Sequence, residues 1–212
     1  LGTESATLIL TGAGSSEFVG NAIHNWLRAG FSREVLSIPT THLVTHAEST
    51  LLVGRPYTVV SFARSGNSPE SVATYDRVRK LSPQAHQIVI TCNSDGDLAN
   101  RAASDPRALS IVLPERTHDR SLVMTSSYST MAWTAACLPL IETPSKRDRL
   151  LQQICSGASR VLQVYPDLLE QFGRLEFQRA AYLGSGNLTG TMQESALKMM
   201  EMTDGQVATR FD

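Results

Sequence analysis

The sequence lacks the features that mark membrane-spanning and nucleic-acid-binding chains. No stretch of eighteen consecutive apolar residues occurs in its 212 residues, and residues 1–10 do not show the charged-then-apolar order of a secretion signal. The 19 lysines and arginines are balanced by 20 aspartates and glutamates, and they form no run long enough to follow a phosphate backbone. We therefore expect a cytoplasmic protein with no membrane and no nucleic acid among its partners.

Cysteine and metal-ligand patterns are also sparse. Cys92, Cys137 and Cys155 are odd in number, widely spaced and set among apolar residues, which predicts reduced thiols in the core rather than disulfides. Of the five histidines, only His42 and His46 have a spacing that a helix could use to hold zinc, and no third ligand stands nearby. We expect no metal site.

What the sequence does contain is an alternation of short apolar strands with segments of helical period. Hydrophobic residues make up 42% of the chain and charged residues 18%, which is enough apolar material for a globular core. The predicted strands are residues 7–11, 34–38, 57–63, 87–92 and 109–113, and the predicted helices include one from residue 69, one at 98–103 and one at 131–141. Continuous apolar strands separated by helices indicate a parallel sheet covered on both faces. The prediction is an α/β fold, a three-layer α-β-α sandwich around a five-stranded, flavodoxin-like parallel sheet.

The C-terminal third of the chain begins to repeat its opening. Residues 147–177 are predicted to form two helical stretches broken near Tyr165 and Pro166. A short apolar segment then enters a Gly184-Ser185-Gly186 turn, which stands 172 residues after the Gly12-Ala13-Gly14 turn. We predict tandem copies of one module: a first domain at 1–145, a helical connector at 146–177, and a truncated second copy at 178–212. We therefore expect the sequence to be a fragment of a longer protein.

Small polar residues gather where the third predicted strand ends. Ser65 and Ser68 offer hydroxyl groups, Gly66 allows close approach to the backbone, and a helix begins at Pro69 with Ser68 as its N-cap. In open parallel sheets, ligands bind beyond the carboxyl ends of the strands, where helix N-termini present free amides to an anion. The segment therefore predicts a phosphate site, although a plain turn followed by an N-cap fits the local sequence equally well.

Two other loops have the same character. Ser15 and Ser16 follow the first strand, and residues 125–127 open a helix after the fifth, so three loops could converge on one crevice. The Gly12-Ala13-Gly14 turn also invites a dinucleotide interpretation, but Glu17 stands where the third glycine of that fingerprint belongs. A tight turn and an anion or sugar site remain as interpretations.

The last predicted helix carries a charged stripe. At about 100° per residue, Glu194, Lys198 and Glu201 fall on one face of it. This pattern is typical of a solvated face with a Glu–Lys pair four residues apart, and it is also compatible with a catalytic group.

Together these motifs resemble the sugar isomerase (SIS) domain family. The likeness rests on the Gly14-Ser15-Ser16 turn and on the segments FARSGNSPESVATYDRV, VMTSSYSTM and LGSGNLTGTMQESALKMMEMTDG, and it spans nearly the whole chain. Within that family the chain is most similar to the tagatose-6-phosphate ketose/aldose isomerase group, whose members are associated with isomerisation and deamination of galactosamine 6-phosphate.

The resemblance assigns roles to the candidate residues. The residues implied to bind the sugar phosphate are Ser16, Arg64, Ser65, Gly66, Ser68, Thr125 and Ser126. Glu201 would be the base that moves a proton between carbons 1 and 2 of the open-chain sugar, with Glu194 and Lys198 positioning or tuning it.

The activity that the resemblance implies is aldose–ketose isomerisation or deamination of a phosphorylated hexose or amino hexose. No cofactor is needed for this chemistry, a homodimer is the expected assembly, and the residue that opens the sugar ring is expected beyond residue 212. The alternative is a regulatory SIS protein that binds a sugar phosphate without reacting it. That alternative has no need of Glu201.

Overall fold

The chain alternates strands and helices along its length, as the sequence predicts. The computed structural model describes residues 6–212. The strands are β1 (Thr7–Thr11), β2 (Val35–Ser37), β3 (Tyr57–Ala63), β4 (His86–Thr91), β5 (Ala108–Val112), β6 (Arg179–Tyr182) and β7 (Ala208–Phe211). The α-helices are α1 (Ser15–Phe31), α2 (Thr40–Thr50), α3 (Pro69–Leu81), α4 (Asp97–Ala103), α5 (Ser126–Ala136), α6 (Pro144–Val164), α7 (Pro166–Gly173) and α8 (Leu188–Met202), and two short 3-10 helices are η1 (Glu115–Thr117) and η2 (Leu138–Leu140).

The first five strands form one parallel sheet in the order β2-β1-β3-β4-β5. All residues of β1 and β3 are buried, which explains why both strands are continuously apolar or small rather than alternating. The direction of winding reverses between β1 and β3, since β2 lies on one side of this pair and β4 and β5 lie on the other. A reversal of this kind opens a crevice at the carboxyl ends of the two strands.

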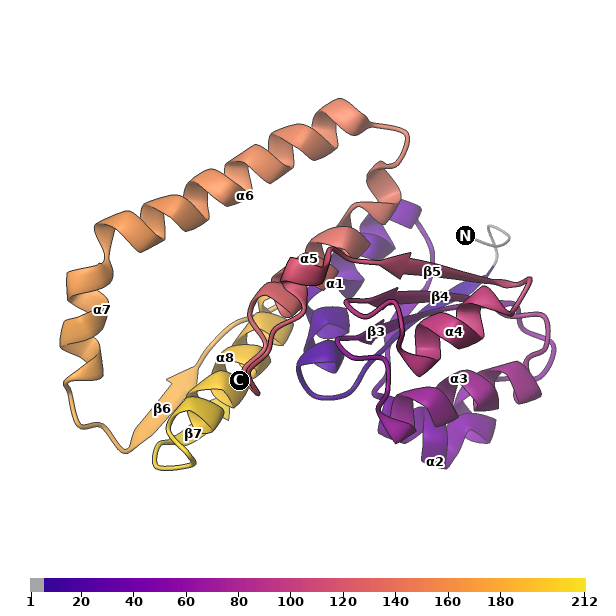
Figure 1. Ribbon diagram of the computed structural model, residues 1–212, viewed down its shortest axis with the longest axis horizontal. Helices are drawn as coiled ribbons and strands as arrows, with labels where there is room; N and C mark the ends of the chain where they lie inside the picture. The colour runs from indigo at the N-terminus through magenta and orange to yellow at the C-terminus, as the bar shows by residue number, and fades with distance from the viewer. Residues whose placement is uncertain (1–5) are drawn as a thin grey trace.

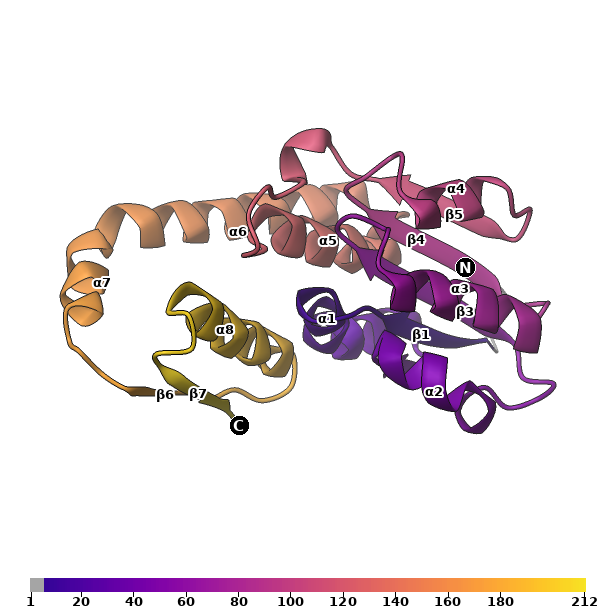
Figure 2. The same ribbon diagram turned by 60° about the horizontal axis from the view of Figure 1, so that its bottom comes forward.

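Helices cover both faces of the sheet (Figures 1 and 2). On one face, α1 and α5 pack through Val19 and Met131 against Leu10 and Phe62 of the sheet. On the other face, α2, α3 and α4 cover the sheet, with Leu43 of α2 in contact with the cluster around Val59. The predicted three-layer sandwich with a five-stranded parallel sheet is confirmed.

A second, smaller unit packs against the first through α8. Strands β6 and β7 pair in parallel, and α8 lies beside α1 (Figure 2). The two helices approach so closely that a Cβ atom on Gly190 would stand 2.2 Å from the backbone nitrogen of Ala22. Asn21 Nδ2 donates a hydrogen bond of 2.7 Å to Gln193 Oε1 across the same contact.

Two features bear on the predicted duplication, which stays a prediction. Gly14 and Gly186 precede α1 and α8 and both have positive φ angles, 56° and 61°. Each lies in a turn that leads from a parallel strand into a helix.

Helices α6 and α7 form an arm that extends away from the sheet (Figure 1). The arm breaks at Tyr165 and Pro166, as predicted, because proline cannot continue the hydrogen bonding of the preceding helix. None of its residues is buried, and apolar side chains such as Ile154 and Phe172 are more than half exposed. No helix within residues 6–212 combines the length and the apolar character that crossing a bilayer would require.

Several sequence expectations were wrong in detail. Helix α2 and strand β7 were not anticipated, whereas α5 begins at Ser126, within the helix start predicted at residues 125–127. Helix α6 begins at Pro144, two residues before the predicted connector, because proline is well tolerated at the first position of a helix. Cys92 is buried as expected, but Cys155 is exposed on α6 and is no core thiol.

Replacing Gly190 by alanine is expected to destabilise the protein, because the added methyl group must push α8 away from the α1 backbone. Overpacking of this kind costs about 1–3 kcal/mol in the free energy of unfolding, measurable by urea titration. Gly157→Ala is the matched control, since a Cβ there meets nothing within 4 Å and alanine favours a helix over glycine. Equal stability of the two variants would contradict the close contact.

Candidate active site

A small cavity lies at the crevice between β1 and β3, where the winding reverses. Its volume is about 150 Å³, and it is called the serine cavity below. The lining residues are Ala13, Ser16, Phe62, Ala63, Arg64, Ser65, Gly66, Ser68, Glu70, Ser71 and Met124. The structure therefore brings together five residues that the sequence nominated from two separate loops: Ser16, Arg64, Ser65, Gly66 and Ser68.

The loop after β3 is held in place by the segment that follows β4. Asn93 Nδ2 donates to the carbonyl oxygen of Ser65 at 2.9 Å, and the Leu98 amide donates to that of Gly66 at 3.1 Å. Gly66 has a φ of 71°, a backbone conformation that side-chain-bearing residues adopt with strain. These hydrogen bonds hold the backbone of the loop in one conformation in the absence of a ligand.

The start of α3 supplies donors to the serine cavity. Ser68 is the N-cap and Pro69 the first helical residue, as predicted, but the Ser68 hydroxyl donates to Ser71 Oγ at 2.7 Å and caps no amide. Pro69 has no N–H and the Ser71 amide donates to the Ser68 carbonyl oxygen, so the Glu70 amide is the first-turn donor left for an anion at the positive end of the helix. Glu70 also lines the cavity, and sequence analysis had assigned it no role.

The predicted binding residues Thr125 and Ser126 do not line the serine cavity, although their neighbour Met124 does. Their polar groups surround the Asp119 carboxylate instead. Asp119 accepts five hydrogen bonds of 2.6–3.1 Å, from the amides of Thr125, Ser126 and Ser127 and from the hydroxyls of Thr125 and Ser127.

These bonds determine the ionisation of Asp119. Partial burial on its own would raise the pKa of this carboxyl, but the hydrogen bonds from Ser127 and Thr125 outweigh it and hold the pKa far below its usual range. Asp119 therefore remains an anion at the N-terminus of α5. The sequence does not reveal this residue because it precedes the first residue of the helix by seven positions, well outside the ordinary capping pattern.

The charged stripe of α8 is buried rather than solvated. The side chains of Glu194, Lys198 and Glu201 are 8%, 15% and 17% exposed. Lys198 Nζ lies 2.5 Å from Glu201 Oε2 and 3.5 Å from Glu194 Oε1, so one ammonium group serves two carboxylates. The interpretation as a solvated face was wrong, and the three residues predicted to act together are in contact.

Glu194 faces the N-terminus of α1. Burial raises the pKa of its carboxyl, and the Ser15 hydroxyl and the Lys198 ammonium oppose that rise. Ser15 is followed by Ser16, which lines the serine cavity, so consecutive residues of α1 meet the charged cluster and the predicted phosphate site. The first turn of α1 connects the two halves of the candidate site.

Tyr128 of α5 is a further residue near the charged cluster that sequence analysis did not nominate. Burial raises the pKa of its phenol to about 12, and the charge of Glu194 acts in the same direction. The helical period of residues 126–136 marks Tyr128 only as a partly buried aromatic residue.

The histidines on α2 lie against each other. The rings of His42 and His46 stack with their centroids 5.2 Å apart. Within residues 6–212, no group of three or more His, Cys, Asp or Glu side chains is arranged to hold a metal ion.

Comparison with known proteins places this site in a family. No family model matches the sequence. The chain is 38% identical over 210 residues to D-galactosamine-6-phosphate deaminase AgaS of Escherichia coli and 34% identical over 208 residues to AgaS of Shewanella sp. (strain ANA-3). The crystal structure of tagatose-6-phosphate ketose/aldose isomerase from Escherichia coli matches with a TM-score of 0.90 at 37% identity, over 99% of this chain and 57% of that one. The chain belongs to the sugar isomerase (SIS) family.

The match covers nearly all of this chain but only part of its relatives. The alignments include 99% and 97% of the chain and 54% and 53% of the two AgaS proteins, so the chain spans about half the length of the curated relatives it matches. Glucosamine-6-phosphate deaminase from Thermotoga maritima, with a TM-score of 0.75 and 19% identity, shares the SIS fold.

Asp119→Ala is expected to lower the free energy of unfolding near neutral pH by about 1 kcal/mol, the usual scale for losing a helix cap. Because the folded-state pKa of Asp119 is lowered, its contribution is complete above the ordinary aspartate pKa of about 4 and is lost as the pH falls below it. Urea titrations at pH 7 and pH 3 should show the difference between wild type and variant shrinking at the lower pH.

The control for this experiment is Glu142→Gln, which removes one carboxylate from an exposed position. A deficit of Asp119→Ala that is the same at both pH values would contradict the role of the ionised Asp119 carboxylate.

Proposed function

We propose that this SIS domain belongs to an enzyme that isomerises or deaminates a phosphorylated amino hexose, with galactosamine 6-phosphate as substrate and tagatose 6-phosphate and ammonia as products. The observation that supports it best is the buried Glu194–Lys198–Glu201 cluster, which packs beside the helix whose first turn lines the serine cavity. The names of the relatives point to the same substrate class.

The phosphate group of the substrate binds in the serine cavity. Ser16, Ser65 and Ser68 supply hydroxyl donors, and the Glu70 amide adds a donor at the positive end of a helix dipole. A doubly negative phosphate is held in this way without a lysine.

Glu201 transfers the proton. In the open-chain amino sugar, its carboxylate takes the proton from carbon 2, the electron pair of that C–H bond forms the carbon 1–carbon 2 double bond of an enolamine, and the carbonyl electron pair moves to the oxygen on carbon 1, which takes up a proton from water. Returning the first proton to carbon 1, while the nitrogen gives one proton back to water, leaves a C=N bond at carbon 2. Water adds to this bond and ammonia departs, which yields the ketose phosphate without any external oxidant or reductant.

Lys198 and Glu194 position the base. The Lys198 ammonium lies 2.5 Å from Glu201 Oε2 and holds that carboxylate in place. Glu194 Oε1 lies 3.5 Å from the same ammonium and helps to fix where the lysine lies. A regulatory protein that only binds sugar phosphates has no need of a cluster that is costly to bury.

The assembly is proposed to be a homodimer that needs no cofactor, in line with the resemblance stated above. The ring-opening residue is proposed to lie outside residues 6–212.

Glu201→Gln in the protein that carries this sequence is expected to lower kcat for ammonia release from galactosamine 6-phosphate by about 10²–10⁴-fold, the usual contribution of a general base. Substrate binding, measured by calorimetry, should change little because the serine cavity is intact. The exposed Glu176→Gln is the matched control. If wild type and Glu201→Gln bind the sugar phosphate and are equally inert, the protein is a sensor and the enzymatic proposal fails.

The double variant Ser65→Ala, Ser68→Ala should weaken phosphate binding. We expect KM to rise about 10–100-fold, the result of losing two hydrogen bonds to a charged group, while kcat is less affected. Ser94→Ala removes an exposed hydroxyl next to α4 and serves as the control. Unchanged KM in the double variant would place the phosphate elsewhere.

A further inference from the structure

A second and larger cavity adjoins the serine cavity. It has a volume of about 930 Å³ and is called the arginine cavity below. The lining residues are Arg64, Glu115, Arg116, His118, Asp119 and Arg120. Apart from Arg64, they come from a single segment after β5, and Arg64 lines both cavities.

Hydrogen bonds hold Asp119 and Arg64 in place at the edge of this cavity. The Asp119 carboxylate accepts five hydrogen bonds from groups at the start of α5. The Arg64 guanidinium donates to the carbonyl oxygen of Ser121 at 2.6 Å, which is a neutral partner. Arg64 has no carboxylate partner within residues 6–212, and with Arg116 and Arg120 it gives the cavity three guanidinium groups against the two carboxylates of Glu115 and Asp119.

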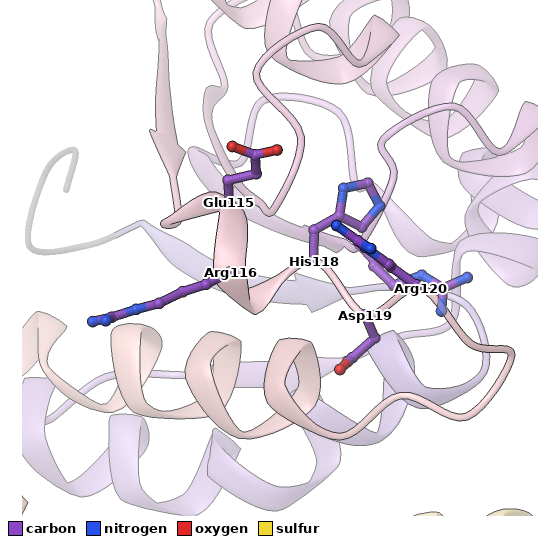
Figure 3. A pocket seen from close by; sticks show the side chains of 6 residues that line it. Glu115, Arg116, His118, Asp119 and Arg120 are labelled. Atoms are coloured by element: carbon purple, nitrogen blue, oxygen red, sulfur yellow. The ribbon is translucent and has the colours of Figure 1, made fainter.

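The two remaining arginines have no acidic partner either. Within the described residues, Arg116 and Arg120 take part in no ion pair and no side-chain hydrogen bond. Glu115 is next to Arg116 in the chain, but Figure 3 shows their side chains pointing in different directions. The same view shows His118 and Arg120 on one side of the loop, with Arg116 reaching to the other.

We propose that the arginine cavity is a second anion-binding site, which takes a phosphate-bearing ligand distinct from the phosphate held by the serine cavity. Guanidinium groups match phosphate oxygens in geometry as well as in charge, and a concave surface with an excess of positive charge concentrates anions. The volume accommodates a ligand several times larger than a single phosphate group.

Arg64 couples the two sites. An anion in the arginine cavity competes with the Ser121 carbonyl and with a phosphate in the serine cavity for the same guanidinium group. Occupation of one site consequently weakens the other, and the effect is reciprocal because both ligands draw on one interaction.

Inorganic pyrophosphate is the probe for this site, titrated by calorimetry into the full chain. In the Ser65→Ala, Ser68→Ala background, which disables the serine cavity, we expect pyrophosphate to bind still and to bind more weakly as salt is raised. Adding Arg116→Gln and Arg120→Gln should weaken that binding by about tenfold or more. Both arginines are exposed, so the substitutions leave the packed core untouched.

The matched control carries Arg149→Gln and Arg160→Gln in the same background. These exposed arginines lie on α6, outside the residues that line the cavity, and their removal changes the net charge by the same amount. If this control loses as much affinity for pyrophosphate as the Arg116→Gln, Arg120→Gln variant, the loss is due to net charge alone and the proposal is overturned. Absence of any pyrophosphate binding in the serine-deficient background would overturn it as well.

Discussion

The contact between α1 and α8 is the interaction on which the candidate site depends. The serine cavity belongs to the five-stranded sheet, whereas the charged cluster belongs to a helix that follows a separate pair of strands. Gly190 lets the two helix backbones approach to a distance that no side chain would allow, and Asn21 and Gln193 bond across the contact. A shift of α8 would therefore move the charged cluster away from the first turn of α1 and alter the burial that raises the Glu194 pKa.

A second constraint is the way in which the loop after β5 is fixed at both ends. Asp119 attaches it to the N-terminus of α5, and Arg64 attaches it to the loop after β3. The carboxylate satisfies a helix end that would otherwise attract an anionic ligand, so the amides that begin α5 are not open to a phosphate. A single acidic side chain thereby removes this loop from the candidate phosphate sites.

The sequence predicts much of this fold because its strongest signals are local. β1 and β3 have the bounds that their apolar runs indicate, and Ser68 with Pro69 marks the start of α3. α2 was missed because its residues, rich in threonine and histidine, have weak helix propensity and are held in place by packing on the sheet. β7 was missed because only its pairing with β6 makes four residues a strand.

The limits of prediction for the site have the same origin. Ser16 and residues 64–68 follow from the rule that parallel strands place their carboxyl ends at one edge, and the stripe of α8 follows from helical period. Helical period shows which residues of α8 share a face but not which helix packs over that face. The burial of the stripe could therefore not be predicted from the sequence. The positions of Asp119 and Tyr128 depend on contacts between segments that are distant in the sequence. No local pattern in the sequence specifies those contacts.

The interface between α1 and α8 joins residues at one constant distance in the sequence. Asn21 and Gln193 are 172 residues apart, as are Phe18 and Gly190, which also meet in this contact, and the same number separates the two glycine turns. Like positions meet in this way beside the axis of a homodimer. At the same offset of 172 residues, the positions equivalent to Glu194, Lys198 and Glu201 are Ala22, Trp26 and Ala29. The charged cluster therefore lies on α8 alone, and the equivalent positions of α1 carry two alanines and a tryptophan.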